Sequence, residues 1–215
     1  AILITHTHTD HIAGLQTLLK RCGAPVFATE RACRELAWRL PDADSRLEVL
    51  DFGVSQSIGE FSVTAIHTSH DAPGSCGFRL DGTGGSVGIL TDTGYVTEEA
   101  AAVLPGVDLA VLEANHDVET LCSGPYPYYL KQRILGAEGH LSNEDAARFA
   151  VLLAEHGASE ILLAHLSREN NTPAMAHQAV ETALSAAGLC PALSVAPRDT
   201  MSAAHSVCRR AVCRK

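Results

Sequence analysis

The 215-residue sequence has no long apolar run and no excess of basic side chains. No window approaches the about 18 consecutive apolar residues of a membrane span, so we expect no membrane segment. No basic and apolar leader opens the chain, and we therefore expect a cytoplasmic location. The net charge is −9, from 16 Lys and Arg against 25 Asp and Glu. This balance argues against a broad electrostatic surface for nucleic acid, but it leaves room for a local basic lane.

Cysteines are present but lack the spacing of a disulfide framework or a thiolate metal site. No CxxC pair occurs among the seven, which are Cys22, Cys33, Cys76, Cys122, Cys190, Cys208 and Cys213. Scattered cysteines in odd number are poor evidence for either kind of site, so we expect reduced thiols.

Strand-like and helix-like segments alternate along the chain, which is typical of a layered α/β domain. We expect strands at 1–5, 25–28, 47–53, 61–71, 77–82, 86–94, 108–117, 160–167 and 192–196. We expect helices from Ile12 to Gly23, from Thr29 to Arg39, from Ser142 to His156 and from Thr172 to Ala187. Ser142 and Thr172 are candidate N-terminal caps, and the DGTGG run at 81–85 predicts a hairpin.

One domain is the economical interpretation, because the chain shows no repeat, linker or low-complexity tract. We expect it to span residues 1–200 and to be followed by a basic tail at 201–215. The chain begins with Ala1 rather than Met, and its richest motif follows after a few residues. We therefore expect residues upstream of Ala1 to be missing.

That motif is HTHTDH, at residues 6–11, directly after the first predicted strand. In an extended segment alternate side chains share a face, so His6 and His8 can bind one metal ion. Asp10 and His11 follow where the chain turns into a helix, and can reach a second, adjacent position. Imidazole and carboxylate are ligands that suit Zn²⁺ and Mn²⁺.

Three later residues lie where they could complete such a site. His70 ends one predicted strand, Asp92 ends another, and His165 nearly ends a third. They therefore share the strand-end position of His6. His67 could compete with His70, but we favour His70 because it lies at the strand exit and is followed by Asp71.

HTHTDH with a later His, Asp and His resembles the metallo-β-lactamase superfamily. Six further blocks resemble its YycJ/WalJ branch: SHDA (69–72), TDTGYV (91–96), EANHD (113–117), YPYYLKQRI (126–134), GHLSNEDAA (139–147) and LAHLSRENN (163–171). The resemblance covers residues 6 to about 171. It implies the superfamily's αββα sandwich, a four-layer α/β fold, here without the strands that normally precede the motif.

The resemblance also implies a site for two divalent cations, Zn²⁺ or Mn²⁺. One ion would be held by His6, His8 and His70, the other by Asp10, His11 and His165, with Asp92 between them. Such paired ions activate a bridging water as the nucleophile. Asp10 would orient that water as well as bind metal, so it is a candidate catalytic residue.

His140 and His116 lie in the resembling blocks but outside this ligand set. His140 precedes the predicted Ser142 cap, where free backbone N–H groups favour a phosphate. We hypothesise that His140 contacts the scissile phosphate or protonates the leaving oxygen, with His116 assisting. The alternative is that both are structural hydrogen-bonding residues.

The resemblance favours a phosphodiesterase, specifically a 5′-to-3′ exonuclease with DNA as its substrate. Lys131, Arg133 and Arg168 are candidate backbone contacts, although one Trp and five Phe offer no aromatic-rich groove. A thioester or lactone hydrolase of the same fold is the first alternative. A non-catalytic metal-binding regulatory protein is the second, and the retained Asp10 argues against it. β-Lactamase activity ranks low, because those enzymes commonly have Cys where this chain has Asp92. The sequence makes no prediction of oligomeric state.

Overall fold

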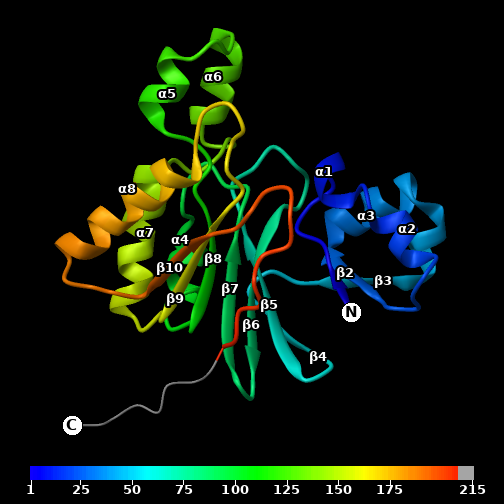
Figure 1. Cartoon of the computed structure of the whole chain (residues 1–215). Coiled ribbons are helices and arrows are strands. Elements are labelled where there is room, and N and C mark those ends of the chain that lie inside the picture. The colour runs from blue at the N-terminus through cyan, green and yellow to red at the C-terminus, as the bar shows by residue number, and fades with distance from the viewer. Residues whose placement is uncertain (208–215) are drawn as a thin grey trace.

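The computed structural model describes residues 1–207, which form four layers in the order helices, sheet, sheet, helices (Figure 1). The last part of the expected tail, with Cys208 and Cys213, lies outside the described residues. Residues 201–207 form no helix or strand. The other five cysteines form no disulfide with one another.

The smaller sheet has three parallel strands in the order β1-β2-β3. They are β1 (Ile2–Leu3), β2 (Val26–Thr29) and β3 (Leu47–Leu50). Its outer face carries α1 (Thr9–Ile12), α2 (Leu15–Leu19), α3 (Glu30–Arg39) and the 3-10 helix η1 (Pro41–Arg46). Leu15, Leu36 and Val26 are buried together between these helices and the sheet. Within the described residues β1 pairs with β2 alone, so it forms one edge of this sheet.

The larger sheet has seven strands in the order β10-β9-β8-β7-β6-β5-β4. They are β4 (Ser55–Ile58), β5 (Phe61–His67), β6 (Cys76–Gly82), β7 (Gly85–Leu90), β8 (Leu109–Glu113), β9 (Glu160–Ala164) and β10 (Ala192–Val195). Strands β4 to β7 pair antiparallel and β7 to β10 pair parallel. The predicted hairpin is the β6–β7 connection.

Three helices cover the outer face of this sheet: α4 (Glu98–Val103), α7 (Asn143–Glu155) and α8 (Pro173–Ala186). Ser142 and Thr172 cap α7 and α8 as predicted, each accepting a backbone N–H three residues on. Leu112, Phe149 and Ile161 are buried in the core beneath these helices. Burying such a side chain contributes about 1.5–3 kcal/mol.

The inner faces of the two sheets pack on each other. Phe27 and Leu50 of the smaller sheet belong to one buried cluster with Val63 and Phe78 of the larger sheet. Two sheets sharing an apolar interface, each covered outside by helices, make the αββα arrangement. The predicted fold is therefore confirmed.

Several elements differ from the prediction. The expected helix from Ile12 is divided into α1 and α2, and β5 ends at His67, so His70 lies in the following loop. Neither α5 (Val118–Ser123) nor α6 (Tyr128–Leu135) was predicted, and α4 was missed as well. All three are only six to eight residues long, too short for a clear helical period. Helices α5 and α6 lie beyond the end of the larger sheet, as Figure 1 shows.

Candidate metal centre

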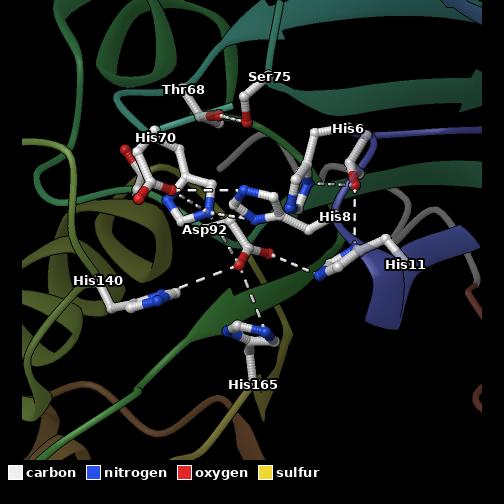
Figure 2. Close-up of polar contacts among 12 residues, drawn as sticks. His6, His8, His11, Thr68, His70, Ser75, Asp92, His140 and His165 are labelled. Carbon is white, nitrogen blue, oxygen red and sulfur yellow. Dashed lines mark hydrogen bonds and ion pairs between the residues drawn. The ribbon is translucent and has the colours of Figure 1, made fainter. Parts of the chain in front are cut away.

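The seven candidate ligands come from four loops that meet at one end of the two sheets. One runs from β1 into α1, which carries Asp10 and His11, and the others leave β5, β7 and β9, so each begins where a strand ends. Figure 2 labels all of these residues except Asp10 and shows the labelled histidines turned toward one another around Asp92. The strand-end placement predicted from the sequence thus brings these residues into one cluster.

His6, His8 and His70 form the first part of the cluster. Each offers one ring nitrogen, and the three atoms lie within 4.8 Å of one another. His8 Nδ1 lies 3.3 Å from His70 Nε2. His70 Nδ1 lies 3.2 Å from the carbonyl oxygen of Gly139 and donates to it, which leaves Nε2 unprotonated in the neutral ring. A hydrogen bond of this kind fixes the tautomer of a metal-binding histidine.

Thr5 links the two parts of the cluster. It is not among the site residues predicted from the sequence. Its Oγ1 lies 3.1 Å from His6 Nδ1 and 3.2 Å from His11 Nδ1. A hydroxyl oxygen has two lone pairs and can accept from both rings. With both Nδ1 atoms protonated, the Nε2 atoms of His6 and His11 are the free ligands. Thr5 is a small polar residue directly before HTHTDH, and nothing in the sequence marks it further.

The second part of the cluster comprises Asp10, His11 and His165, whose ligand-type atoms also lie within 4.8 Å of one another. Asp10 is exposed at the start of α1, and its Oδ2 is 3.6 Å from His11 Nε2. Nε2 of His165 is free to face the cluster because its Nδ1 donates to another residue, Glu113, at 2.8 Å.

Asp92 lies between the two parts and approaches both with its carboxylate. Oδ2 is 3.4 Å from His11 Nε2, while Oδ1 is 3.4 Å from His165 Nε2 and 3.8 Å from His70 Nε2. Oδ1 therefore approaches a histidine from each part of the cluster, and Oδ2 approaches a histidine of the second part. Asp92 is buried, with a relative exposure of 2%.

Two buried atoms without hydrogen-bond partners indicate whether this cluster can bind metal ions. Nε2 of His6 and Oδ2 of Asp92 are buried without a hydrogen-bond partner. Buried polar atoms are normally paired, since an unpaired one costs about 1–3 kcal/mol. His6, His11 and Asp92 each offer one ligand-type atom, and these three atoms fall within 4.8 Å of one another. A divalent cation bound here would give both unpaired atoms a partner. The residues present are therefore suited to bind a metal ion.

Glu113 orients two histidines of the centre through hydrogen bonds. It was also absent from the residues predicted from the sequence. It is fully buried at the end of β8, where Oε1 accepts from His140 Nδ1 at 2.9 Å and from His165 Nδ1 at 2.8 Å. Oε2 accepts the backbone N–H groups of Thr93 and Leu141, each at 3.1 Å. The signal was available, because an acid ending an otherwise apolar strand needs a buried partner.

The pKa values of the buried groups follow from these contacts. Burial alone would raise the pKa of Glu113, but the hydrogen bonds from His140 and His165 outweigh it and lower the pKa to about 2. Burial would lower the pKa of His165, but the hydrogen bond to Glu113 and the charge of Asp92 raise it to about 9. Without metal, His165 therefore carries a proton at neutral pH that a cation must displace.

His6 behaves in the opposite way. Burial, followed by the charges of His11 and His70, lowers its pKa to about 2. Its imidazole is therefore neutral across the physiological range, which is the form that binds metal. Burial also lowers the pKa of His70.

The loops that carry the ligands are tied together. Thr68 and Ser75, both buried, share a 2.6 Å hydrogen bond that closes the base of the His70 loop (Figure 2). The backbone N–H of Gly94 donates to the carbonyl oxygen of Ser69 at 2.9 Å. A Cβ on Gly94 would lie 2.1 Å from the carbonyl oxygen of Ala137, so only glycine permits this approach.

Asp71 connects the centre to α6. Its Oδ1 lies 3.6 Å from His8 Nε2 and 3.5 Å from His70 Nε2, and its Oδ2 accepts from Arg133 Nε at 2.8 Å. Burial alone would raise the pKa of Asp71, but the hydrogen bond from Arg133 lowers it. The carboxylate is therefore ionised and holds α6 next to the histidines.

The two other predicted catalytic residues are placed differently. His140 lies beside Asp92 (Figure 2), with its Nδ1 3.8 Å from Asp92 Oδ1. His116 is 1% exposed, has no hydrogen-bond partner for either ring nitrogen, and belongs to none of the clusters that could hold a metal. Burial lowers its pKa. The structure therefore brings His140 to the centre but not His116.

A family model described as the β-lactamase superfamily domain matches residues 1–166. The chain belongs to the metallo-β-lactamase superfamily. Exodeoxyribonuclease WalJ of Streptococcus pneumoniae is 38% identical over 192 residues, covering 88% of this chain and 71% of that protein. Exodeoxyribonuclease YycJ of Bacillus anthracis is 36% identical over 190 residues, covering 87% and 71%. The predicted YycJ/WalJ resemblance is thereby confirmed.

Solved structures agree on the fold of this superfamily member. The metallo-β-lactamase fold protein YhfI of Bacillus subtilis superposes with a TM-score of 0.66 at 22% identity, covering 90% of this chain and 73% of that one. The family and its relatives establish a metal-dependent hydrolase. Within residues 1–207 no helix combines the length and apolarity that a membrane crossing requires.

Proposed function

We propose that this hydrolase cleaves phosphodiester bonds of DNA as a 5′-to-3′ exonuclease, using two divalent cations, Zn²⁺ or Mn²⁺. His6, His8 and His70 would hold one ion, Asp10, His11 and His165 the other, and Asp92 both. The observation that carries the proposal is the position of Asp92. Its Oδ1 approaches His70 of the first set and His165 of the second, while its buried Oδ2 lies near His11 without a hydrogen-bond partner. When bound, such a pair of ions lowers the pKa of a water and stabilises charge on the attacking and leaving oxygens.

The side chains of the chain would supply orientation and a proton. Asp10 is exposed beside His11, where a carboxylate can accept a hydrogen bond from the attacking water. The Nδ1–H of His140 donates a hydrogen bond to Glu113, which leaves Nε2 of the neutral ring unprotonated. Nε2 would take up the proton that the attacking water releases and pass it to the leaving oxygen. His116 is too buried to contact a polymer substrate. If it contributes to catalysis, it would do so by acting on His140.

DNA is proposed because the relatives at 36–38% identity are named exodeoxyribonucleases. A cavity of about 950 Å³ beside the centre is lined by Asp10, His165, Arg168 and Arg198, among others, and offers a path for a strand. Arg168 pairs with Asp199, and Arg198 donates to two carbonyl oxygens. Phosphate groups that contact these two arginines would have to compete with the existing bonds.

We also propose that residues 1–200 form the hydrolase domain. The family match ends at 166, but α8 and β10 continue the same sheet and core.

The test is to incubate the protein with Mn²⁺ or Zn²⁺ and three substrates: 5′-labelled DNA, bis-p-nitrophenyl phosphate and a chromogenic lactam. We expect release of mononucleotides from DNA, lost in Asp10→Ala. Hydrolysis of the lactam alone, or of a thioester or lactone in a parallel assay, would replace the proposal by a small-molecule hydrolase. Metal binding without any turnover would favour the regulatory alternative.

A further inference from the structure

A second, smaller cavity of about 240 Å³ also borders the candidate centre. His70 and His140 form its inner wall, and the side chains of Tyr126, Leu130 and Ile134 form its outer wall. The large cavity described above begins instead at Asp10 and His165. The two cavities thus border different ligands of the cluster and differ about fourfold in volume.

The outer wall is the apolar side of α6 and of the residues just before it. Leu130 and Ile134 are four residues apart and therefore share one face of the helix. Helix α6 contributes no fully buried side chain, so this face is not used to build the core. Tyr126, Leu130 and Ile134 are all partly exposed. An apolar helix face turned into a cavity beside a reaction centre favours a ligand with an apolar surface.

The inner wall adds polar groups. The side-chain amide of Asn115 donates to the carbonyl oxygen of His165 at 2.9 Å, which fixes its orientation. The Ser167 hydroxyl accepts the backbone N–H of Asn170 at 3.2 Å and keeps its own proton to donate. The lining also includes the charged side chains of Asp71, Arg133 and Glu138, so the cavity joins an apolar helix face to polar surroundings. A few oriented polar groups are the usual means of fixing a ligand's orientation.

We propose that this cavity, which we call the α6 cavity, holds the terminal nucleoside of the strand, next to the phosphate being cleaved. The proposal rests on the function proposed above. An unpaired base has two apolar faces and a polar edge, which match the Tyr126 wall and the Asn115 and Ser167 groups. The aromatic ring of Tyr126 can stack on any base, so the site tolerates different sequences.

The size of the α6 cavity bears on the mode of cleavage. Its volume lies below the range of about 300–1,000 Å³ that holds a drug-sized ligand, so it has room for one nucleoside but not for a base pair. Arg133, which also lines it, is held by Asp71, and this ion pair fixes α6 as the far wall. A small cavity with room for one unit, next to a larger cavity, would position the bond next to a strand end.

The test compares binding of a deoxynucleoside 3′-monophosphate with binding of inorganic phosphate by titration calorimetry, on metal-loaded protein. The 3′-phosphate is chosen because the bond cleaved at a 5′ end follows O3′ of the terminal nucleoside. We expect the nucleotide to bind at least tenfold more tightly than phosphate. Leu130→Trp, which fills the α6 cavity, should remove this preference and leave phosphate binding unchanged. Tyr126→Ala should weaken nucleotide binding about tenfold. Tyr129→Ala, on the exposed part of the same helix, is the matched control and should retain the preference.

Equal affinity for nucleotide and phosphate in the unchanged protein would overturn the proposal. So would a preference that survives Leu130→Trp in protein that remains folded by thermal unfolding. If Leu130→Trp does not fold, the effects of Tyr126→Ala and Tyr129→Ala on nucleotide binding are compared instead. Equal effects would place the base on the exposed helix surface and overturn the proposal. Failure of the proposed function is a separate result, in which DNA is not hydrolysed whether or not the nucleotide binds.

Discussion

Asp92 and His165 are the two non-glycine residues with positive φ in the described part of the chain, each with φ of 58°. Their side chains meet, with Asp92 Oδ1 3.4 Å from His165 Nε2. A residue other than glycine in this conformation costs on the order of 1–3 kcal/mol, and such residues cluster at functional sites. Strain at both positions serves to turn two strand ends toward the same point.

Asp92→Asn should separate the conformational role of Asp92 from its charge. Asparagine tolerates positive φ and keeps the shape, so we expect a thermal unfolding midpoint within a few degrees of the original. The loss of the anionic oxygen between the histidines should lower metal affinity at least tenfold. Asp92→Val serves as the contrast, because a β-branched residue resists positive φ and should destabilise the fold as well. Full metal affinity in Asp92→Asn would rule out a shared ligand here.

Glu113→Ala should damage both stability and metal binding. The change leaves His140, His165 and two backbone N–H groups without their buried acceptor, and we expect a loss of about 3–5 kcal/mol in the free energy of unfolding. Denaturant unfolding of metal-free protein measures it. Glu113→Gln keeps a carbonyl oxygen, so its stability loss should be smaller, while metal affinity should still fall by about 10–100-fold. Unchanged affinity in Glu113→Gln would show that this carboxylate does not orient the ligands.

Thr5→Val removes the hydroxyl that contacts His6 and His11 but keeps the side-chain shape. We expect metal affinity to fall about 10–100-fold with little change in secondary structure by circular dichroism. Thr5→Ser, which retains the hydroxyl, is the matched control and should bind metal nearly as well as the original protein. A Thr5→Val protein with unaltered affinity would mean that the ring tautomers are fixed by other contacts.

The pH dependence of stability should change sign when metal binds. In metal-free protein the pKa of His165 is raised from 6.5 to about 9, so its stabilising contribution is complete below pH 6.5 and is lost as pH rises through 9. Burial lowers the pKa of His6 below 6.5, so protonation of the unfolded chain removes stability as pH falls. The metal-free protein should therefore be most stable near pH 6.5.

Bound metal should reverse the loss of stability above pH 6.5, because the cation requires unprotonated His165. Between pH 6.5 and 9 we expect the unfolding midpoint of metal-free protein to fall and metal affinity to rise. Thermal unfolding in a chelator, compared with metal titrations over the same pH range, measures both. His165→Asn, which tolerates positive φ, should lose the alkaline decline. A flat metal-free profile in the original protein would contradict the raised pKa of His165.

The sequence predicted the fold class and the seven clustered residues because both depend on local patterns. Buried strands are readable as apolar runs, and His6, Asp92 and His165 each follow one. Glu113 was missed because its role arises from contacts between distant segments: it meets His140 from 27 positions away. Thr5 contacts His6 and His11, which are near it in the chain, but a threonine before the motif has no feature that marks this role. The short helices α5 and α6 span only about two turns each, too few to establish a helical pattern in the sequence. The wall of the α6 cavity therefore could not be foreseen. His70 was placed at a strand end, whereas pairing of β5 stops at His67.

The central claim is that two cations share one site built on Asp92. Anomalous diffraction from crystals grown with Mn²⁺ tests it most directly. We predict two peaks about 3.5–4 Å apart, one within bonding distance of His6, His8 and His70 and the other of Asp10, His11 and His165, with Asp92 reaching both. A single peak, or a pair of peaks that Asp92 does not reach, would contradict the account.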